Sequence, residues 1–246
     1  MQGVNTNLKK AIVTGANGFI GSWLVKELIR RDVEVFAVIR NEASDKSNIS
    51  GLDHLHIIYC DLSNIHNLTS LIHDRDIDAF FFFFLAGAGG TDRTNYMLQL
   101  SNAKYACDCA KVAKEFNCKK FLASGTITEK IAENILSTDI KSGNTIYGIC
   151  KHTTHCLLDV LCRNIAIEYV WMRFSNIYGP YSTNGNIVEF TIRQLIKGNI
   201  PMFGRAEQPY DLMYIEDLVR AIYLLGAKST KKNCYYIGSG NPRILK

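Results

Sequence analysis

The stretch TGANGFIGSWL, residues 14–24, places glycines at positions 15, 18 and 21, directly after an apolar segment and at the start of a helical pattern. Glycine at such positions permits a tight turn, close approach of the backbone to a pyrophosphate and close packing of helix on strand. The N–H groups that begin the helix favour a phosphate. We therefore predict a dinucleotide-binding turn rather than a plain strand-to-helix turn. The predicted contacts are Gly15, Asn17, Gly18, Phe19, Ile20 and Gly21.

Short apolar segments alternate with longer helical patterns along most of the chain. The apolar segments are KAIVTG (10–15), EVFAVIR (34–40), LHIIYC (55–60), AFFFFFLA (79–86) and KFLAS (120–124), and helical patterns begin at Ser22 and Ser63 and extend around Leu98–Phe116. Strands of a doubly wound parallel sheet are covered on both faces, so they read as continuous apolar runs. The pattern predicts an α/β fold of the Rossmann type, with the phenylalanine run 80–84 in a strand at its centre.

The composition excludes several classes of protein. A hydrophobic content of 47% over 246 residues is enough for a sizeable core. The 28 basic and 23 acidic residues are scattered, so the net charge of +5 forms no nucleic-acid-binding stripe. The longest apolar run is too short to span a bilayer, so neither a membrane nor a nucleic acid is expected as a partner. Eight cysteines without zinc-like spacing indicate reduced thiols of a cytoplasmic protein, with no metal site.

Seven segments occur in a characteristic order: TGANGFIG, CDLSN, FLAGAG, FLASGT, YGICK, MRFSNIYGP and YIEDLVRAI. With them, the chain resembles the extended short-chain dehydrogenase/reductase superfamily, of the NAD-dependent epimerase/dehydratase type, from about Lys10 to its last residue. The resemblance implies a Rossmann domain over residues 1–175 and a small substrate lobe over 176–246, of which 210–240 partly return to the first domain. The final segment YYIGSGNPRILK resembles a strand and the start of a late helix, so we expect a shorter lobe than in relatives.

Two side chains that carry chemistry stand four residues apart in YGICK. Tyr147 and Lys151 project from one face of a helix expected over Tyr147–Asn164, so the ammonium can lower the pKa of the phenol toward a usable range. A tyrosinate can act as general base on a hydroxyl whose carbon gives hydride to nicotinamide. The resemblance implies that Lys151 also binds the nicotinamide ribose and that a hydroxyl at the end of FLASGT completes the catalytic set. Alignment on the following run favours Thr126 for this role and leaves Ser124 as a substrate contact.

The end of the second predicted strand decides between two nicotinamide cofactors. An acidic residue there would bind the adenosine ribose hydroxyls, whereas a cation would accept a 2′-phosphate. Ile39 stands where the acid is expected and Arg40 follows, which favours NADP(H) over NAD(H). The resemblance implies that Asp61 contacts the adenine. It implies further cofactor contacts at Leu62, Leu85, Ala86 and Gly87.

The last third of the chain resembles the substrate lobe of nucleotide-sugar enzymes. By this resemblance Asn176 contacts the diphosphate of the substrate, and Asn186 and Phe203 contact its nucleotide. One departure is Tyr210, which stands where those enzymes often keep an arginine on the phosphates. Arg205 could compensate only if its loop points inward. A nucleotide sugar is the expected substrate.

These residues predict a soluble NAD(P)-dependent enzyme that acts at a sugar carbon of a nucleotide-activated sugar, as a 4-ketoreductase or an epimerase. Sugar 4,6-dehydratases of this superfamily carry an Asp-Glu pair directly after the catalytic hydroxyl. Ile127 and Thr128 stand at those places, which argues against dehydration. Two alternatives stay open: a cofactor sensor that binds NADP(H) without chemistry, and a reductase of a small non-sugar carbonyl compound.

Superfamily members commonly dimerise through the helix before FLASGT and the helix that carries the tyrosine and lysine, so we expect a homodimer. Each helix must also cover the sheet with one apolar face. Residues at helical spacing that could serve either face are Leu100, Ala103, Cys107 and Ala110 on the first helix and His155, Leu158 and Cys162 on the second. The alternative is that all of them belong to the core and that the outer faces are solvated.

Overall fold

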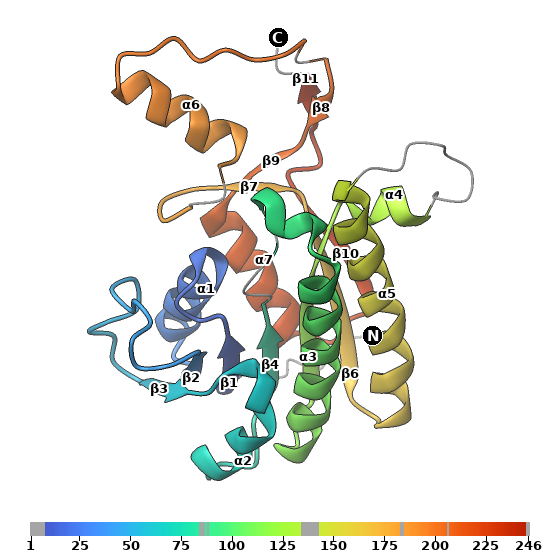
Figure 1. Cartoon of the computed structure of the whole chain (residues 1–246). Coiled ribbons are helices and arrows are strands. Elements are labelled where there is room, and N and C mark those ends of the chain that lie inside the picture. The colour runs from blue at the N-terminus through green and yellow to red at the C-terminus, as the bar shows by residue number, and fades with distance from the viewer. Residues whose placement is uncertain are drawn as a thin grey trace.

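Seven strands form the central sheet of the computed structural model, which describes residues 8–83, 87, 89–133, 143–182, 185–205 and 207–244. The strands are β1 (Lys10–Thr14), β2 (Glu34–Ile39), β3 (Leu55–Tyr59), β4 (Ala79–Phe82), β5 (Lys120–Thr126), β6 (Glu168–Phe174) and β10 (Cys234–Ile237). Their order is β10-β6-β5-β4-β1-β2-β3, and all neighbours run parallel (Figure 1). The predicted Rossmann-type α/β fold is confirmed.

Helices cover both faces of this sheet (Figure 1). One face carries α1 (Phe19–Arg30) and α7 (Ile215–Ala227), and the other carries η1 (Leu62–Asn67), α2 (Leu68–Leu71), α3 (Tyr96–Glu115) and α5 (Gly143–Asn164). Two short helices, η2 (Gly90–Thr94) and α4 (Glu129–Glu133), lie near the start of α5. Within the described residues, no helix is long and apolar enough to cross a membrane.

The phenylalanine strand β4 supplies side chains to both cores. Successive residues of a strand point to opposite faces. Accordingly Phe81 packs among side chains of α1 and α7, whereas Phe80 and Phe82 pack among those of α3 and α5. All three are fully buried. A strand buried on both faces favours apolar side chains at every position, which explains the unbroken apolar run in the sequence.

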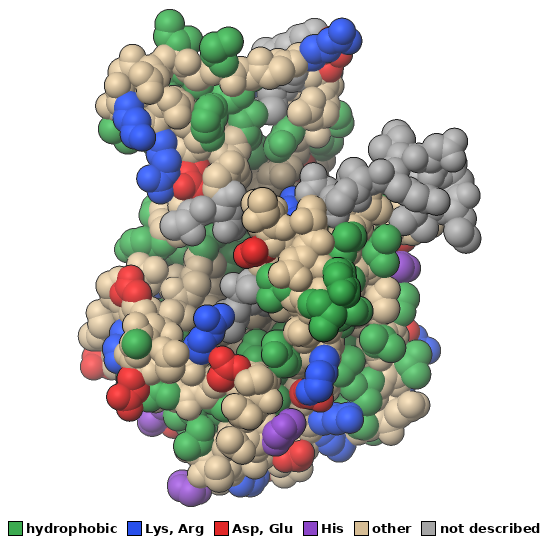
Figure 2. Space-filling view, in the orientation of Figure 1, with side chains coloured by type: hydrophobic (Ala, Val, Ile, Leu, Met, Phe, Trp, Pro, Cys, Tyr) green, Lys and Arg blue, Asp and Glu red, His purple; other side chains and the backbone are tan. Residues whose placement is uncertain are grey.

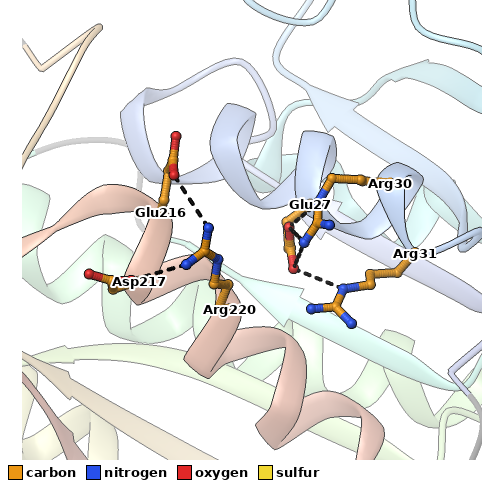
Figure 3. Close-up of polar contacts among 6 residues, drawn as sticks. All are labelled: Glu27, Arg30, Arg31, Glu216, Asp217 and Arg220. Carbon is orange, nitrogen blue, oxygen red and sulfur yellow. Dashed lines mark hydrogen bonds and ion pairs between the residues drawn. The ribbon is translucent and has the colours of Figure 1, made fainter.

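The two helices on the first face lie side by side and carry their own ion pairs (Figure 3). Glu27 of α1 accepts hydrogen bonds from Arg30 and Arg31, and Arg220 of α7 pairs with Glu216 and Asp217. These pairs join neighbours along the chain within each helix and do not join the two helices to each other. Apolar packing holds α1 against α7, and the guanidinium of Arg31 lies over the Tyr223 ring of α7 at 4.8 Å.

Several predicted boundaries differ from the structure. The helix expected from Ser63 is a 3₁₀ helix followed by one α-turn, because Asp61 caps the start and Asn64 has non-helical backbone angles. Helices α1, α3 and α5 begin before the expected residues, and β4 ends at Phe82. Residue 84 of the phenylalanine run lies outside the described residues.

A small lobe stands above the carboxyl ends of the strands (Figure 1). It contains α6 (Ile187–Ile196), a parallel pair of β7 (Asn176–Tyr178) and β9 (Leu212–Tyr214), and an antiparallel pair of β8 (Pro209–Tyr210) and β11 (Arg243–Ile244). Helix α6 buries none of its side chains completely. The chain then returns, because α7 packs on the central sheet and β10 joins its edge.

Candidate active site

The glycine turn lies between β1 and α1, where the strand order reverses at the carboxyl edge of the sheet. Gly15 adopts a left-handed backbone with φ of 62°, and its carbonyl accepts a hydrogen bond from the Gly18 N–H at 3.0 Å. A Cβ on Gly21 would lie 2.0 Å from that carbonyl oxygen, so only glycine fits there. Ligands of open α/β sheets bind at such a reversal of strand order.

This turn fits the pyrophosphate of a dinucleotide. Gly18 occupies the N-cap position of α1 and supplies no side-chain cap, so the N–H groups of the first turn are not covered by it. Phe19 and Ile20 begin the helix, and Asn17 is tied to the neighbouring loop by a 2.7 Å hydrogen bond to the carbonyl of Asp45. The predicted contacts thus lie together around one backbone cradle.

Arg40 lies directly beyond β2 with 57% of its side chain exposed, and its Nε is 3.7 Å from a carboxylate oxygen of Asp61. Asp61 also accepts hydrogen bonds from the N–H and hydroxyl of Ser63, which together with Arg40 keep the pKa of its carboxyl low. Leu62 is buried in the core next to this pair. The two charged residues expected at the adenosine end of the cofactor are therefore brought together.

The predicted contacts after β4 are only partly described. Gly87 has φ of 81°, and its carbonyl accepts a hydrogen bond from the side chain of Gln99 at 2.9 Å. A Cβ at this position would meet the same amide nitrogen at 2.3 Å. Leu85 and Ala86 lie outside the described residues. The backbone angle of Gly87 therefore favours glycine, and a side chain there would also displace the amide of Gln99.

The three predicted catalytic side chains converge at the carboxyl end of β5. Thr126 is the last residue of that strand, and its side chain hydrogen-bonds Tyr147. The ammonium of Lys151, one helical turn beyond Tyr147 on α5, lies 6.0 Å from the centre of the phenol ring and donates to the carbonyl of Ser124 at 2.9 Å. Ser124 is itself buried in β5, and Lys151 and Tyr147 are each less than 10% exposed.

The expected lowering of the Tyr147 pKa by Lys151 is wrong for this arrangement. Burial raises the pKa of Tyr147, while the charge of Arg93 and the hydrogen bond with Thr126 lower it. Burial also lowers the pKa of Lys151 well below its usual value. Spacing along a helix shows that two side chains share a face, but it does not show how deeply water is excluded from them.

Two charged residues next to the catalytic set were missed in the sequence. Arg93 places its guanidinium carbon 4.6 Å from the centre of the Tyr147 ring. Glu129, whose side chain is fully buried, accepts hydrogen bonds from the Thr126 N–H at 2.7 Å and from the Trp171 indole and Arg173 at 2.9 Å each. The arginine within the apolar strand β6 is a signal that could have indicated a buried acidic partner.

The predicted substrate residues lie in and around the small lobe. Asn176 begins β7 and is half-buried. Asn186 caps α6, accepting from the Glu189 N–H at 2.9 Å and donating to the Ile177 carbonyl at 3.1 Å. Much of its hydrogen-bonding capacity is therefore used within the lobe.

The loop after α6 carries the other two predicted substrate contacts. Phe203 packs edge-on against Phe190, and Arg205 is exposed. A groove of about 500 Å³ lies beside α6. Its lining includes Tyr178, Tyr181, Asn186, Glu189, Ile192 and Tyr214.

The sheet order and the glycine turn define a Rossmann-type α/β protein. Within that class, the chain belongs to the NAD dependent epimerase/dehydratase family, which it matches over residues 11–238.

Individual relatives are distant but cover most of the chain. It is similar to dTDP-glucose 4,6-dehydratase of Escherichia coli, with 25% identity over 271 residues that cover 95% of this chain and 73% of the relative. It is also similar to ADP-L-glycero-D-manno-heptose-6-epimerase of Brachyspira hyodysenteriae, with 25% identity over 244 residues that cover 94% and 76%. The solved structure of UDP-glucuronic acid 4-epimerase from Bacillus cereus in complex with NAD has a TM-score of 0.74 and 25% identity, covering 95% of this chain and 79% of that one.

Proposed function

We propose that this protein is an NAD(P)-dependent oxidoreductase or epimerase of a nucleotide-activated sugar, acting as a 4-ketoreductase or an epimerase. The proposal rests on the convergence of Thr126, Tyr147 and Lys151 at the carboxyl edge of the sheet. The glycine turn lies at the same edge. The named relatives are a nucleotide-sugar dehydratase and two nucleotide-sugar epimerases, which supports this class of substrate.

We assign each catalytic side chain the role that the family resemblance implies for it. When bound, the nicotinamide ring accepts or supplies the hydride. During oxidation the Tyr147 phenolate takes the proton of the sugar hydroxyl as the hydride leaves the same carbon, and during reduction the phenol returns a proton to the carbonyl oxygen. Thr126 donates a hydrogen bond to the reacting oxygen, and Lys151 orients the cofactor ribose. An epimerase reuses one proton and one hydride, whereas a reductase takes both anew in each turnover.

Dehydration does not fit the residues after Thr126. The hydroxyl of Thr128 is engaged with Thr126 and Arg93, and Ile127 offers no acid or base. The next carboxylate, that of Glu129, is fully buried and accepts three hydrogen bonds. Since elimination of water needs an additional acid and base that reach the sugar, a buried and saturated carboxylate does not replace the missing pair.

The decisive experiment incubates the purified chain with NADPH or NADH and a panel of UDP-, dTDP-, GDP- and CDP-linked sugars and 4-keto sugars. Net loss of reduced cofactor identifies a reductase, and interconversion of sugars without net loss identifies an epimerase. Tyr147→Phe should abolish turnover, while Tyr96→Phe, at a side chain that is 60% exposed, should not. Full activity of Tyr147→Phe would contradict the assignment. Tight NADPH binding without turnover of any sugar would favour the sensor alternative.

We further propose a preference for NADP(H), supported by the exposed guanidinium of Arg40 beyond β2. A 2′-phosphate would form a charge-assisted contact with it, in competition with Asp61. Arg40→Ala should weaken NADPH binding by about 1–3 kcal/mol and leave NADH binding nearly unchanged, as measured by isothermal titration calorimetry. Equal losses for both cofactors, or no loss for either, would remove the preference.

We also propose that the chain forms a homodimer through α3 and α5. Ala103, Ala110, Leu158 and Cys162 are buried, whereas Leu100 is 54% exposed. Apolar side chains gather on the outer side of these helices (Figure 2). They are Tyr96, Met97 and Leu100 on α3 and Ile149, Leu157 and Val160 on α5. Light scattering of the NADP-bound chain should give a dimer mass that Leu157→Lys reduces to a monomer mass, and a monomeric parent chain would contradict the proposal.

A further inference from the structure

Arg93 is a half-buried cation that the mechanism above does not use. Helix η2 delivers its side chain to the face of the Tyr147 ring, with 4.6 Å between the guanidinium carbon and the ring centre. Its Nη2 donates to the hydroxyl of Thr128 at a long 3.3 Å. Its Nε is buried and has no hydrogen-bond partner in the described part of the chain. Neither contact explains why a guanidinium is held in this place.

The other charges around the phenol come from three elements. Lys151 of α5 lies 6.0 Å from the ring centre and directs a hydrogen bond to the backbone of β5. Glu129 of α4 contributes a buried negative charge, and Arg173 of β6 is neutralised by ion pairs with Glu129 and Glu133. Among these described groups, the guanidinium on η2 is the cation closest to the ring and has no acidic partner assigned to it.

We propose that Arg93 is a positioning residue for proton transfer, because its guanidinium holds the Tyr147 ring and stabilises the phenolate that forms when the phenol loses its proton. A cation over an aromatic face is attracted by the ring, and more strongly where water is excluded. A phenolate adds a full negative charge to that attraction. The inference rests on the proposed function, since it takes Tyr147 as the group that exchanges a proton with the sugar.

Electrostatics and geometry agree on the direction of the effect. Burial raises the pKa of Tyr147, and the positive charge of Arg93 opposes this rise, whereas the negative charge of Glu129 adds to it. The two residues therefore act on one phenol with opposite signs. This opposition separates an electrostatic role from a structural one, because damage to packing has no reason to shift the pH dependence in opposite directions.

The experiment compares Arg93→Met, Arg93→Lys and Glu129→Gln with the parent chain. In Arg93→Met the acidic limb of the pH profile of kcat/KM for sugar oxidation should move to higher pH, and the rate at neutral pH should fall about tenfold. Arg93→Lys keeps the charge and should recover most of that loss. In Glu129→Gln, which keeps the size of the side chain, the limb should move to lower pH.

A second readout needs neither substrate nor turnover. With ¹³C-labelled tyrosine, the Cζ resonance of Tyr147 is assigned by its loss in Tyr147→Phe and then followed as the pH is raised. It should titrate at higher pH in Arg93→Met and at lower pH in Glu129→Gln. Titration of Tyr147 in Arg93→Met at the same pH as in the parent chain, or shifts of both variants in one direction, would overturn the inference. If no sugar is turned over but both titrations shift as expected, the proposed function fails, and with it the role in proton transfer, while the effect of Arg93 on the ionisation of Tyr147 stands.

Discussion

A single methyl group added at Gly21 should separate the start of α1 from the turn that precedes it. An alanine Cβ there would lie 2.0 Å from the Gly15 carbonyl oxygen and 3.1 Å from the Ala16 Cα, which are backbone atoms. The helix must then move by about 1 Å, and a close-packed interior resists such movement. Overpacking costs about 1–3 kcal/mol, whereas alanine for glycine within a helix gains about 1 kcal/mol. We expect Gly21→Ala to lower the free energy of unfolding by up to about 2 kcal/mol.

The assay measures stability by urea denaturation and measures cofactor binding through the change in tryptophan fluorescence. Displacement of the helix start also displaces the phosphate cradle, so Gly21→Ala should weaken NADPH and NADH alike. Gly18→Ala is the matched control for stability, because its Cβ would lie 3.2 Å from the same Gly15 oxygen and needs only a slight adjustment. If Gly21→Ala unfolds at the parent urea concentration and binds both cofactors with parent affinity, the close-packing argument is refuted.

Three further changes test other parts of the structure. Gly125→Ala would place a Cβ 2.4 Å from the Trp171 indole nitrogen, so urea denaturation should show a loss of about 2 kcal/mol, whereas Gly204→Ala meets no atom within 4 Å and should not. Burial lowers the pKa of His155 from 6.5 to about 4. As the pH falls, the unfolded chain therefore takes up a proton before the folded chain does. The contribution of neutral His155 to stability is full above pH 6.5 and is lost as the pH falls toward 4. In His155→Gln the difference in unfolding free energy between pH 7 and pH 5 should shrink by about 1 kcal/mol, allowing for partial exposure; an unchanged difference would contradict this. Asn186→Ala should lower the free energy of unfolding by about 1 kcal/mol through loss of the α6 cap. Asn186→Asp should keep most of the parent stability, since aspartate also caps helices. Equal losses of stability for the two variants in thermal unfolding would argue against a capping role.

The parts of the fold that depend on short sequence patterns were predictable. Strands β1, β2, β4 and β5 are buried on both faces, and a continuous apolar run displays this directly in the sequence. The glycine turn was predictable because the backbone angle at Gly15 and the close packing at Gly21 both disfavour a side chain. The proximity of Tyr147 and Lys151 to each other followed from their helical spacing.

The electrostatics of the site depended on contacts that spacing does not reveal. Glu129 stands in a polar run that resembles an exposed helix, yet its partners Trp171 and Arg173 come from a strand more than forty residues later. Arg93 reaches Tyr147 from a short 3₁₀ helix with no periodic pattern. The capping role of Asn186 was missed because an asparagine before a helix can serve either a ligand or the backbone.

The packing of helix α6 determines how fast the amide hydrogens of the small lobe exchange with solvent. None of its side chains is completely buried, and Asn186 joins its first turn to β7 through a hydrogen bond to the Ile177 carbonyl. Opening such a helix exposes little new apolar surface, so its amide hydrogens should exchange with deuterium through local fluctuations, long before those of α1 or α7. A ligand that spans α6 and the sheet would slow this exchange selectively. Deuterium uptake by α6 therefore offers a way to detect substrates that bind without being turned over.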